Sequence, residues 1–478
     1  METVNSNKHL KLNYKRTYLI GFAFFGILLL WQVYDSWCPT LLTELFKNAF
    51  SSSDKEVQYL VGIMMAMDNL AALILLPIFG RISDKTHTRI GKRMPYILVG
   101  TFICAIAFPF IPLLFHFNNL VGVLIMMLIV VIFMMMYRNP AVALMPDLTP
   151  KPLRSKANGI INIMGYIGGA FATVVGIVFV LSDYLGTKLN KDGTPADHTW
   201  AFNNIWAIMM PFIIASVLML ISAVVLFFTV KENKVEEEIA DDLRRGEEMS
   251  ATEDKVDDDK PLTRANKIML ILILGAEFFW FMADNGIGTF MGNYTVYHLG
   301  ASTQSNMLNT ILGGLGSVLG FAIGGIIAGK IGRKWTVFSG LGLSLISYIV
   351  WIIGTFTFLK GAAGSGSFPP IIWVIWFIKG FGMSLVHLNS FPMVVELCNS
   401  KKIGAFTGYY YASSMAAQTI TPIALGSLML IEGFDWAYLP VYAATCLVVS
   451  IAVFFFVKNI KARKEKIATG LEAIGADD

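Results

Sequence analysis

The segment Gly80-Arg-Ile-Ser-Asp-Lys-Thr-His-Thr-Arg-Ile-Gly-Lys-Arg-Met-Pro95 is a short basic stretch between two apolar runs, at 59–81 and 94–115. A membrane-spanning helix needs about 20 mostly apolar residues, because its backbone polar groups must be satisfied within the helix. Both runs meet that length. The segment therefore predicts a charged loop that joins two membrane helices.

Outward from this loop, ten more runs of the same kind can be placed in the chain. The 478 residues are 55% hydrophobic and 15% charged, whereas soluble proteins are about a quarter charged. This composition excludes soluble enzymes, fibrous proteins and disordered chains. The sequence predicts an all-α integral membrane protein with twelve transmembrane helices, at roughly 17–45, 59–81, 94–115, 119–146, 157–182, 203–230, 267–297, 304–329, 335–358, 371–397, 403–431 and 435–457.

The Lys and Arg residues indicate which way these helices face. With the N-terminus inside, the inner ends and short inner loops hold 22 of the 37 basic residues and the central loop holds eight. The outer loops hold five, and Arg138 and Lys379 lie within spans. Because cytoplasmic loops carry the excess of basic residues, both termini are predicted to be cytoplasmic. The scattered basic residues give a net charge of only +4 and exclude a nucleic-acid partner.

The stretch after the sixth run is charged and nearly free of aromatic residues, with acidic runs at Glu236–Glu238 and Asp257–Asp259. A solvated tether is the favoured interpretation, and a regulatory docking site is the alternative. The predicted organisation is an N-terminal six-helix bundle (1–230), a cytoplasmic linker (231–266), a C-terminal six-helix bundle (267–458) and a cytoplasmic tail (459–478).

An offset of 249 residues aligns polar and aromatic positions of the two halves in order. The matched pairs are Gly26 with Gly275, Trp31 with Trp280, Asp35 with Asp284, Gly80 with Gly329, Arg81 with Lys330, Arg138 with His387, Asp147 with Glu396, and Gly159 with Gly408. A parallel duplication of this kind is typical of carriers whose substrate site lies at mid-membrane between the halves.

The Gly80–Pro95 segment resembles the loop signature of the major facilitator superfamily. Its longer spacing is similar to that of the sucrose and maltose proton symporters and of the glycoside–pentoside–hexuronide:cation symporters. Met67-Asp68-Asn69 with Pro77, and Asn139-Pro140 through Pro146-Asp147-Leu148, also resemble the disaccharide carriers. The resemblance implies the major facilitator fold and sugar–cation symport.

Two departures from these relatives bear on the coupling ion. The melibiose-type carriers hold sodium with two acids one turn apart in the second helix, whereas Met64 and Ala72 flank Asp68 here. This difference favours a proton over sodium. The plant-type sucrose carriers have an acid inside the fourth helix, and this chain has none between Phe117 and Pro146.

Ionisable side chains inside a span are costly and usually face a cavity. Proton coupling needs a carboxylate that changes its protonation state, and Asp35 and Asp68 are the leading candidates because both lie at a similar level of the outer half. Glu277 and Asp284 are the other candidates. A structural hydrogen bond to a neighbouring helix is the alternative role for Asp35 and Asp68. Lys379 is predicted either to snorkel outward or to pair with Glu277 or Asp284.

A sugar site needs aromatic faces for the apolar face of a pyranose, with amides and charges for its hydroxyls. Arg138 offers five donors, and its repeat mate His387 is either a proton relay or a hydrogen-bonded core histidine. The predicted substrate-binding residues are Trp31, Gln32, Tyr34, Asn69, Arg138, Trp280, Asn285, His387, Asn389 and Gln418.

Charges at the inner mouth are predicted to act as a gate. Asp84 can pair with Arg89, Lys92 or Arg93, whereas Arg333 stands at the matching position of the second half. Asp147 and Glu396 are expected to pair with loop cations such as Arg154 or Lys401. The predicted gating residues are Gly80, Asp84, Arg89, Gly91, Arg93, Asp147, Arg333 and Glu396.

The predicted function is proton-coupled uptake of a disaccharide or other glycoside by alternating access. A sodium-coupled sugar symporter, a drug or lipid exporter and a non-transporting sugar sensor are the alternatives. No catalytic constellation, cofactor motif or metal spacing is found, and the four cysteines are predicted to be buried side chains. The expected partners are sugar, proton and lipid, for a monomer in the plasma membrane or the bacterial inner membrane.

Overall fold

The computed structural model describes residues 10–254, 263–397 and 403–458, which form helices and loops without a strand. The N-terminal half consists of α1 (Tyr14–Phe50), α2 (Gln58–Asp84), α3 (Met94–Ala107), α4 (Phe110–His116), α5 (Leu120–Asp147), η1 (Lys151–Leu153), α6 (Arg154–Val178), α7 (Leu181–Leu185) and α8 (Ile205–Thr229). The C-terminal half consists of α11 (Arg264–Asn293), the π-helical turn η2 (Tyr294–His298), α12 (Thr303–Ile331), α13 (Arg333–Phe356), η3 (Lys360–Ala362), α14 (Pro370–Val395), α15 (Ile403–Leu428), η5 (Trp436–Tyr438) and α16 (Leu439–Phe455).

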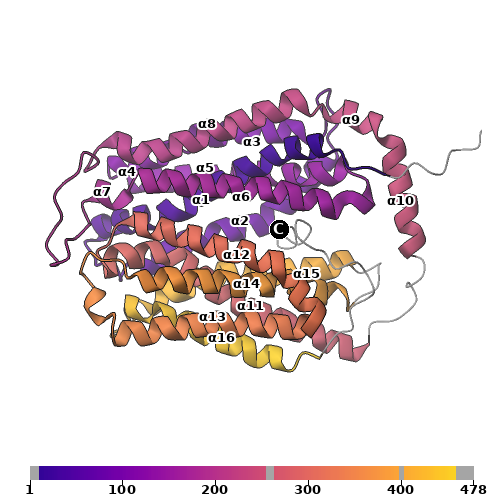
Figure 1. The fold of residues 1–478 in the computed structure, drawn as a ribbon. Coiled ribbons are helices and arrows are strands. Elements are labelled where there is room, and N and C mark those ends of the chain that lie inside the picture. Colours follow the sequence, from indigo (N-terminus) through magenta and orange to yellow (C-terminus); the bar gives the residue numbers. More distant parts are fainter. Residues whose placement is uncertain (1–9, 255–262, 398–402, 459–478) are drawn as a thin grey trace, which may run out of the picture.

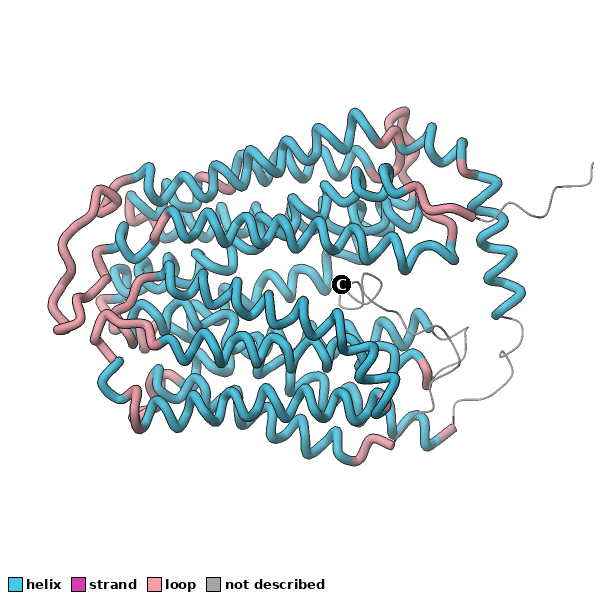
Figure 2. Tube along the Cα trace, viewed as in Figure 1, coloured by secondary structure: helices cyan, strands magenta, loops and turns pink. Residues whose placement is uncertain are grey.

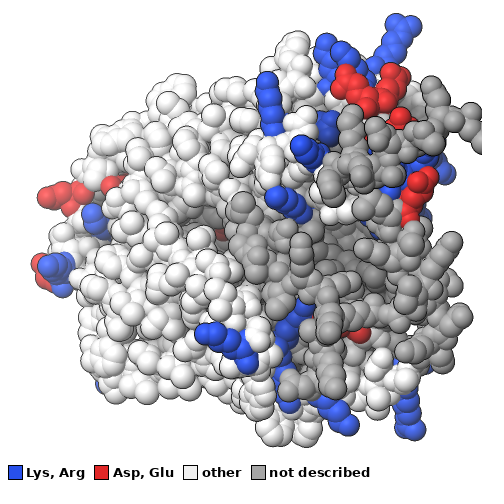
Figure 3. All heavy atoms as spheres, turned by 45° about the vertical axis from the view of Figure 1, so that its right-hand side comes forward, with Lys and Arg blue, Asp and Glu red and all other residues white. Residues whose placement is uncertain are grey.

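The two halves lie side by side with their long helices running in one common direction (Figure 1). Loops gather at the two ends of this bundle (Figure 2). One end carries the segment between the halves and is called the linker end here. The opposite end, where α1 and α11 finish, is called the far end. Lys and Arg side chains gather mainly toward the linker end (Figure 3).

Eleven helical segments of the described residues are long and apolar enough to cross a membrane. The predicted run at 94–115 is one of these segments, Met94–His116, and a short break at Phe108 and Pro109 divides it into α3 and α4. The remaining predicted span, 403–431, is the helix α15, which does not meet the same criterion of apolarity. It packs against α2 and α11.

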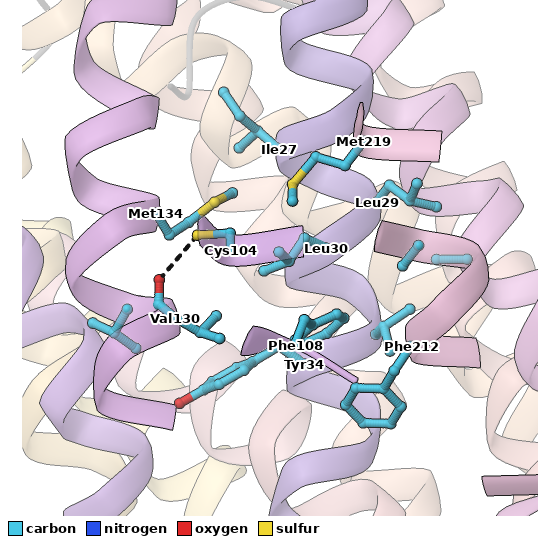
Figure 4. Close-up of a cluster of buried hydrophobic side chains, with 14 of the residues drawn as sticks. Ile27, Leu29, Leu30, Tyr34, Cys104, Phe108, Val130, Met134, Phe212 and Met219 are labelled. Carbon is cyan, nitrogen blue, oxygen red and sulfur yellow. Dashed lines mark hydrogen bonds between the residues drawn. The ribbon is translucent and has the colours of Figure 1, made fainter. Parts of the chain in front are cut away.

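Each half has its own apolar core. In the N-terminal half, α1 packs against α6 and α8, and α3 packs against α5 and α8. Figure 4 shows part of this core, where the Cys104 thiol donates to the carbonyl of Val130 at 3.5 Å. Cys38, Cys104 and Cys446 are buried and free, as predicted, whereas Cys398 lies outside the described residues.

The halves meet mainly through α2 with α15 and through α6 with α12. Close approach requires small residues at these contacts. A β-carbon on Gly62 of α2 would overlap the carbonyl oxygen of Pro422 in α15, and one on Gly426 would overlap the backbone of Gln58.

The described part of the segment between the halves, residues 231–254, is helical, mostly exposed, and in contact with the N-terminal half at two places. Residues of the linker form α9 (Glu232–Glu238) and α10 (Ala240–Asp254). Glu232 is buried against the loop between α2 and α3, and Gly246 of α10 lies against Pro150 and Lys151. The linker therefore docks on the N-terminal half, because its first carboxylate finds backbone donors there.

Candidate functional site

A cavity of about 620 Å³ lies between the two halves. Its walls come from α1, α2 and α5 on one side and from α11, α12, α14 and α15 on the other. The predicted site residues that line it are Trp31, Gln32, Asp35, Asp68, Asn69, Arg138, Asp284, Asn285 and Gln418. Lys379 also lines it.

Two carboxylates and one guanidinium form the charged part of the N-terminal wall. Asp35 of α1 lies deep in the protein but is exposed to the cavity, whereas Asp68 of α2 is buried. Asp68 Oδ1 accepts hydrogen bonds from the backbone N–H of Asn69 at 2.6 Å and from its side-chain amide at 3.0 Å. Arg138 of α5 lies within electrostatic reach of both carboxylates.

Arg138 makes no side-chain hydrogen bond or ion pair with the residues that the structure describes, although it lines the cavity. Its five N–H donors are therefore available to a ligand. A neutral polyol supplies many acceptors for such a fork, so this wall can bind hydroxyl groups beside two acids.

The C-terminal wall carries an ion pair. Lys379 Nζ of α14 contacts Asp284 Oδ1 of α11, and 31% of the Asp284 side chain is exposed. Of the roles predicted for Lys379, the structure shows the ion pair with Asp284 and not snorkelling. Because the opposite charges of Lys379 and Asp284 neutralise each other, this wall is polar but carries no net charge.

Two tryptophans line the cavity, the predicted Trp31 and the unpredicted Trp376 of α14. Trp31 packs edge-on against Tyr34, with ring centroids 5.4 Å apart. Tyr34 itself is buried in the N-terminal core and does not line the cavity. Its task in this arrangement is to support Trp31.

Four predicted residues of the C-terminal half also lie away from the cavity lining. Glu277 and Trp280 are completely buried, and Trp280 packs near Phe454. His387 stacks on Phe281, and the Asn389 amide donates to the carbonyl of Leu385 at 2.9 Å. The residues of α11 that line the cavity begin at Asp284. Glu277 lies two turns nearer the linker end, and so it does not reach the cavity.

A second constellation lies at the linker end of the N-terminal half. Arg93 Nη2 lies 2.5 Å from Asp84 Oδ1, and Arg93 Nε donates to Asp147 Oδ2 at 2.8 Å. Arg93 Nη1 donates to Ser83 Oγ at 2.5 Å. Burial alone lowers the pKa of Arg93, but Asp147 and Asp84 outweigh it and raise this pKa. Arg93 therefore stays charged and ties α2 and α5 to α3.

The other predicted residues of this loop have different tasks. Arg89 is exposed, and within the described part of the chain its backbone carbonyl accepts a hydrogen bond from the Asn233 amide. A β-carbon on Gly80 would lie 2.9 Å from the Asn139 amide, so Gly80 permits the close approach of α2 and α5. Gly91 has a φ of +119°, which side chains of other residues rarely tolerate.

The C-terminal half uses a different pair. Arg333 Nη1 contacts Glu396 Oε1, and both side chains are largely buried. From the sequence, Asp147 and Glu396 are expected to pair with loop cations such as Arg154 or Lys401. Asp147 does pair with loop cations, but these are Arg93 and Lys92. Arg154 instead donates to the carbonyl of Thr149, while Lys401 lies outside the described residues.

Glu232 also belongs to the constellation at the linker end of the N-terminal half, although no sequence motif predicts it. Its carboxylate accepts from the backbone N–H groups of Lys92, Arg93 and Met94 at 3.0–3.1 Å, and so it caps the start of α3. Burial raises the pKa of Glu232, against the lowering effect of these three donors. An acid placed just after the last apolar run of the first half is the only sequence signal for it.

Among the described residues, no group of three His, Cys, Asp or Glu side chains could hold a metal ion. Two helical halves that enclose one polar, charged cavity define a membrane carrier. The family model of the Major Facilitator Superfamily matches residues 20–363 and 273–474. The chain belongs to this superfamily, which confirms the predicted fold class.

No curated protein matches the chain by sequence. Among solved structures, the chain is similar to the POT family transporter PepTSo, with 13% identity over 94% of this chain and 98% of that one and a TM-score of 0.63. It is similar to the inward-open xylose transporter XylE from E. coli, with 14% identity over 95% and 98% of the two chains and a TM-score of 0.63. At these identities the likeness shows the shared fold.

Proposed function

We propose that this protein takes up a sugar together with a proton. The observation that carries the proposal is the N-terminal wall, where Arg138 has its donors available beside Asp35 and Asp68. Trp31 and Trp376 add aromatic faces to the same cavity, and Gln32, Asn69, Asn285 and Gln418 add amides. This set suits a neutral polyol better than an apolar drug or lipid.

The coupling follows from the charges of this wall. While Asp35 and Asp68 are both ionised, they attract the Arg138 guanidinium. A proton on one carboxylate removes one of the negative charges that compete with the hydroxyl groups of the substrate for the Arg138 guanidinium. Asp35 is the first acceptor, because it is exposed to the cavity, and Asp68 is the buried partner.

Alternating access then moves the two halves as units around the cavity, with the linker end facing the cytoplasm. The gathering of Lys and Arg at that end supports this orientation. The Arg93–Asp147 and Arg333–Glu396 contacts lie at that end within the N- and C-terminal halves, respectively, and are proposed to keep each half rigid during the movement. A monomer in a plasma membrane or a bacterial inner membrane suffices for this cycle.

The experiment is pyranine fluorescence inside proteoliposomes, with sucrose, maltose, melibiose or xylosides added outside. Sugar-dependent acidification that is lost in Asp35→Asn or Asp68→Asn supports proton symport and ranks the two acids. Acidification that survives both changes moves coupling to another group. Sugar uptake that needs sodium replaces the proton as the coupling ion, and binding without uptake indicates a sensor.

A zwitterionic substrate is the second candidate, because the cavity carries charges of both signs on its two walls. PepTSo, a POT family transporter, has the same fold. Dipeptides therefore belong in the same panel. Acidification with dipeptides but with no sugar would replace the proposed substrate and keep the proposed coupling.

A further inference from the structure

One buried amide joins the two halves at the far end. Asn293, the last residue of α11, is completely buried. Its Nδ2 donates to Thr43 Oγ1 of α1 and to Gln58 Oε1 of α2, each at 3.0 Å. Its Oδ1 accepts from Thr40 Oγ1 at 2.9 Å. Both N–H groups of the amide and its oxygen are thus used by side chains of the opposite half.

Further hydrogen bonds between the halves surround this amide. Tyr297 of η2 donates its hydroxyl proton to Glu44 at 2.8 Å, and Trp436 of η5 donates to Asp54 at 2.7 Å. On the other side of the bundle, Ser182 and Thr303 exchange backbone-to-side-chain hydrogen bonds at 3.2–3.3 Å. All of these groups lie at the far end.

The amide lies next to the cavity lining, at the far end. Thr40, which donates to Asn293, lines the cavity, as does Gly292, the residue before Asn293. The regular helix also ends here, because the π-helical turn η2 begins at Tyr294. Such π-helical turns often mark functional positions.

These bonds suit a reversible closure. Each hydrogen bond contributes little net free energy when water can replace the lost partner, whereas a buried amide without partners is costly. Separation of the halves at the far end exposes the amide and its three partners to water together. The closure is therefore specific but opens readily.

We propose that Asn293, with Thr40, Thr43 and Gln58, is the gate that closes the substrate cavity at the far end. It opens once in each transport cycle, when these hydrogen bonds pass to water. The inference rests on the proposed carrier function but not on the identity of the substrate or of the coupling ion.

The test is side-selective labelling of a single cysteine. Ser36 lines the cavity on α1, one turn below Thr40, and Ser36→Cys is placed in a full-length chain whose four native cysteines are replaced. A membrane-impermeant maleimide is applied to intact cells and, separately, to inside-out vesicles. Without the gate substitution, we expect labelling from the linker side and slow labelling from the far side.

Asn293→Ala should increase the rate of labelling from the far side by more than about tenfold, because three hydrogen bonds are lost. Thr40→Val, which removes one bond and keeps the side-chain shape, should increase it by about two- to tenfold. The matched control is Asn309→Ala in α12. Asn309 is equally buried, and its amide has no hydrogen-bond partner among the described residues.

Unchanged labelling from the far side in both Asn293→Ala and Thr40→Val overturns the proposal. An equal increase in Asn309→Ala also overturns it, because the effect would then be a general loosening of the helices. No sugar is needed in this assay, so the labelling result can be interpreted even if no substrate has been identified. Thr40→Val keeps the test valid if Asn293→Ala does not fold.

Discussion

The carboxylate of Glu232 lies directly over Gly91, so that a β-carbon on Gly91 would overlap the Glu232 side chain. Gly91 also has a φ of +119°. The loop between α2 and α3 therefore depends on a glycine for two reasons at once, its backbone conformation and the space above it.

Gly91→Ala should lower the free energy of unfolding by about 1–3 kcal/mol, through backbone strain and displacement of Glu232. Thermal unfolding in detergent measures the loss. Gly91→Ala combined with Glu232→Ala should cost less than the sum of the two single changes, because they share one contact. A strictly additive result would contradict the overlap.

Glu232 should make stability depend on pH. Burial raises its pKa in the folded state above the ordinary value of 4.5, so the folded protein binds the proton more tightly than the unfolded chain. Its contribution to stability is therefore largest below pH 4.5 and falls as the pH rises through the folded-state pKa. The melting temperature of the wild type should fall relative to that of Glu232→Gln as the pH rises through this range. A constant difference would contradict the raised pKa.

Arg333→Gln should destabilise the C-terminal half by about 1–3 kcal/mol, because it leaves the largely buried carboxylate of Glu396 without its cation. The charge exchange Arg333→Glu with Glu396→Arg should recover part of the loss. Thermal unfolding checks both. If the exchanged protein is no more stable than Arg333→Gln, the ion pair does not contribute to the stability of the fold.

Trp31 and Trp280 are repeat mates, but they should respond differently to substitution. Trp31→Ala removes an aromatic face from the cavity and should weaken substrate binding by about two- to tenfold. Trp280→Ala empties a fully buried site and should cost about 3–5 kcal/mol of stability. Substrate titration and thermal unfolding of both variants separate the two effects. The reverse pattern would place the cavity elsewhere.

Lys379→Met should reduce stability by about 1–3 kcal/mol, because it leaves Asp284 without its partner in a partly buried place. Lys379→Met with Asp284→Asn should be more stable than Lys379→Met alone. Unfolding measurements on the three variants test this. A double variant that is less stable than Lys379→Met would mean that Asp284 has another stabilising role.

The sequence predicts the spans well, because apolar length is a local property. The repeat offset also places Asp35 and Asp284 correctly, one on each wall of the cavity. The repeat offset is wrong for Trp280, which is fully buried. In the first helix of the N-terminal half the turn that holds Trp31 lines the cavity, whereas the matching turn of α11 does not. Periodicity puts Glu277 on the same helical face as Asp284, but it does not say how far along that face the cavity extends.

The contacts at the linker end depend on tertiary structure and so escape the sequence. Asp84 has three basic residues within reach in the chain, and only the turn at Gly91 selects Arg93. The docking of Glu232 requires the starts of α3 and α9 to meet, which composition cannot reveal. The sequence favours a solvated tether for this charged segment, because it does not show that backbone donors of Lys92, Arg93 and Met94 receive the carboxylate of Glu232.

The composition of α15 bears on how the chain is made in the cell. Insertion of a helix into the bilayer depends on the apolarity of its side chains, and α15 is the one long helix within the two halves that does not meet the apolarity criterion applied to the described residues. Its packing partners, α2 and α11, precede it in the chain and are already synthesised when it emerges from the ribosome. We therefore expect these helices to assist α15 when it enters the lipid, and the insertion efficiency of α15 should fall in a nascent chain that lacks α2 and α11.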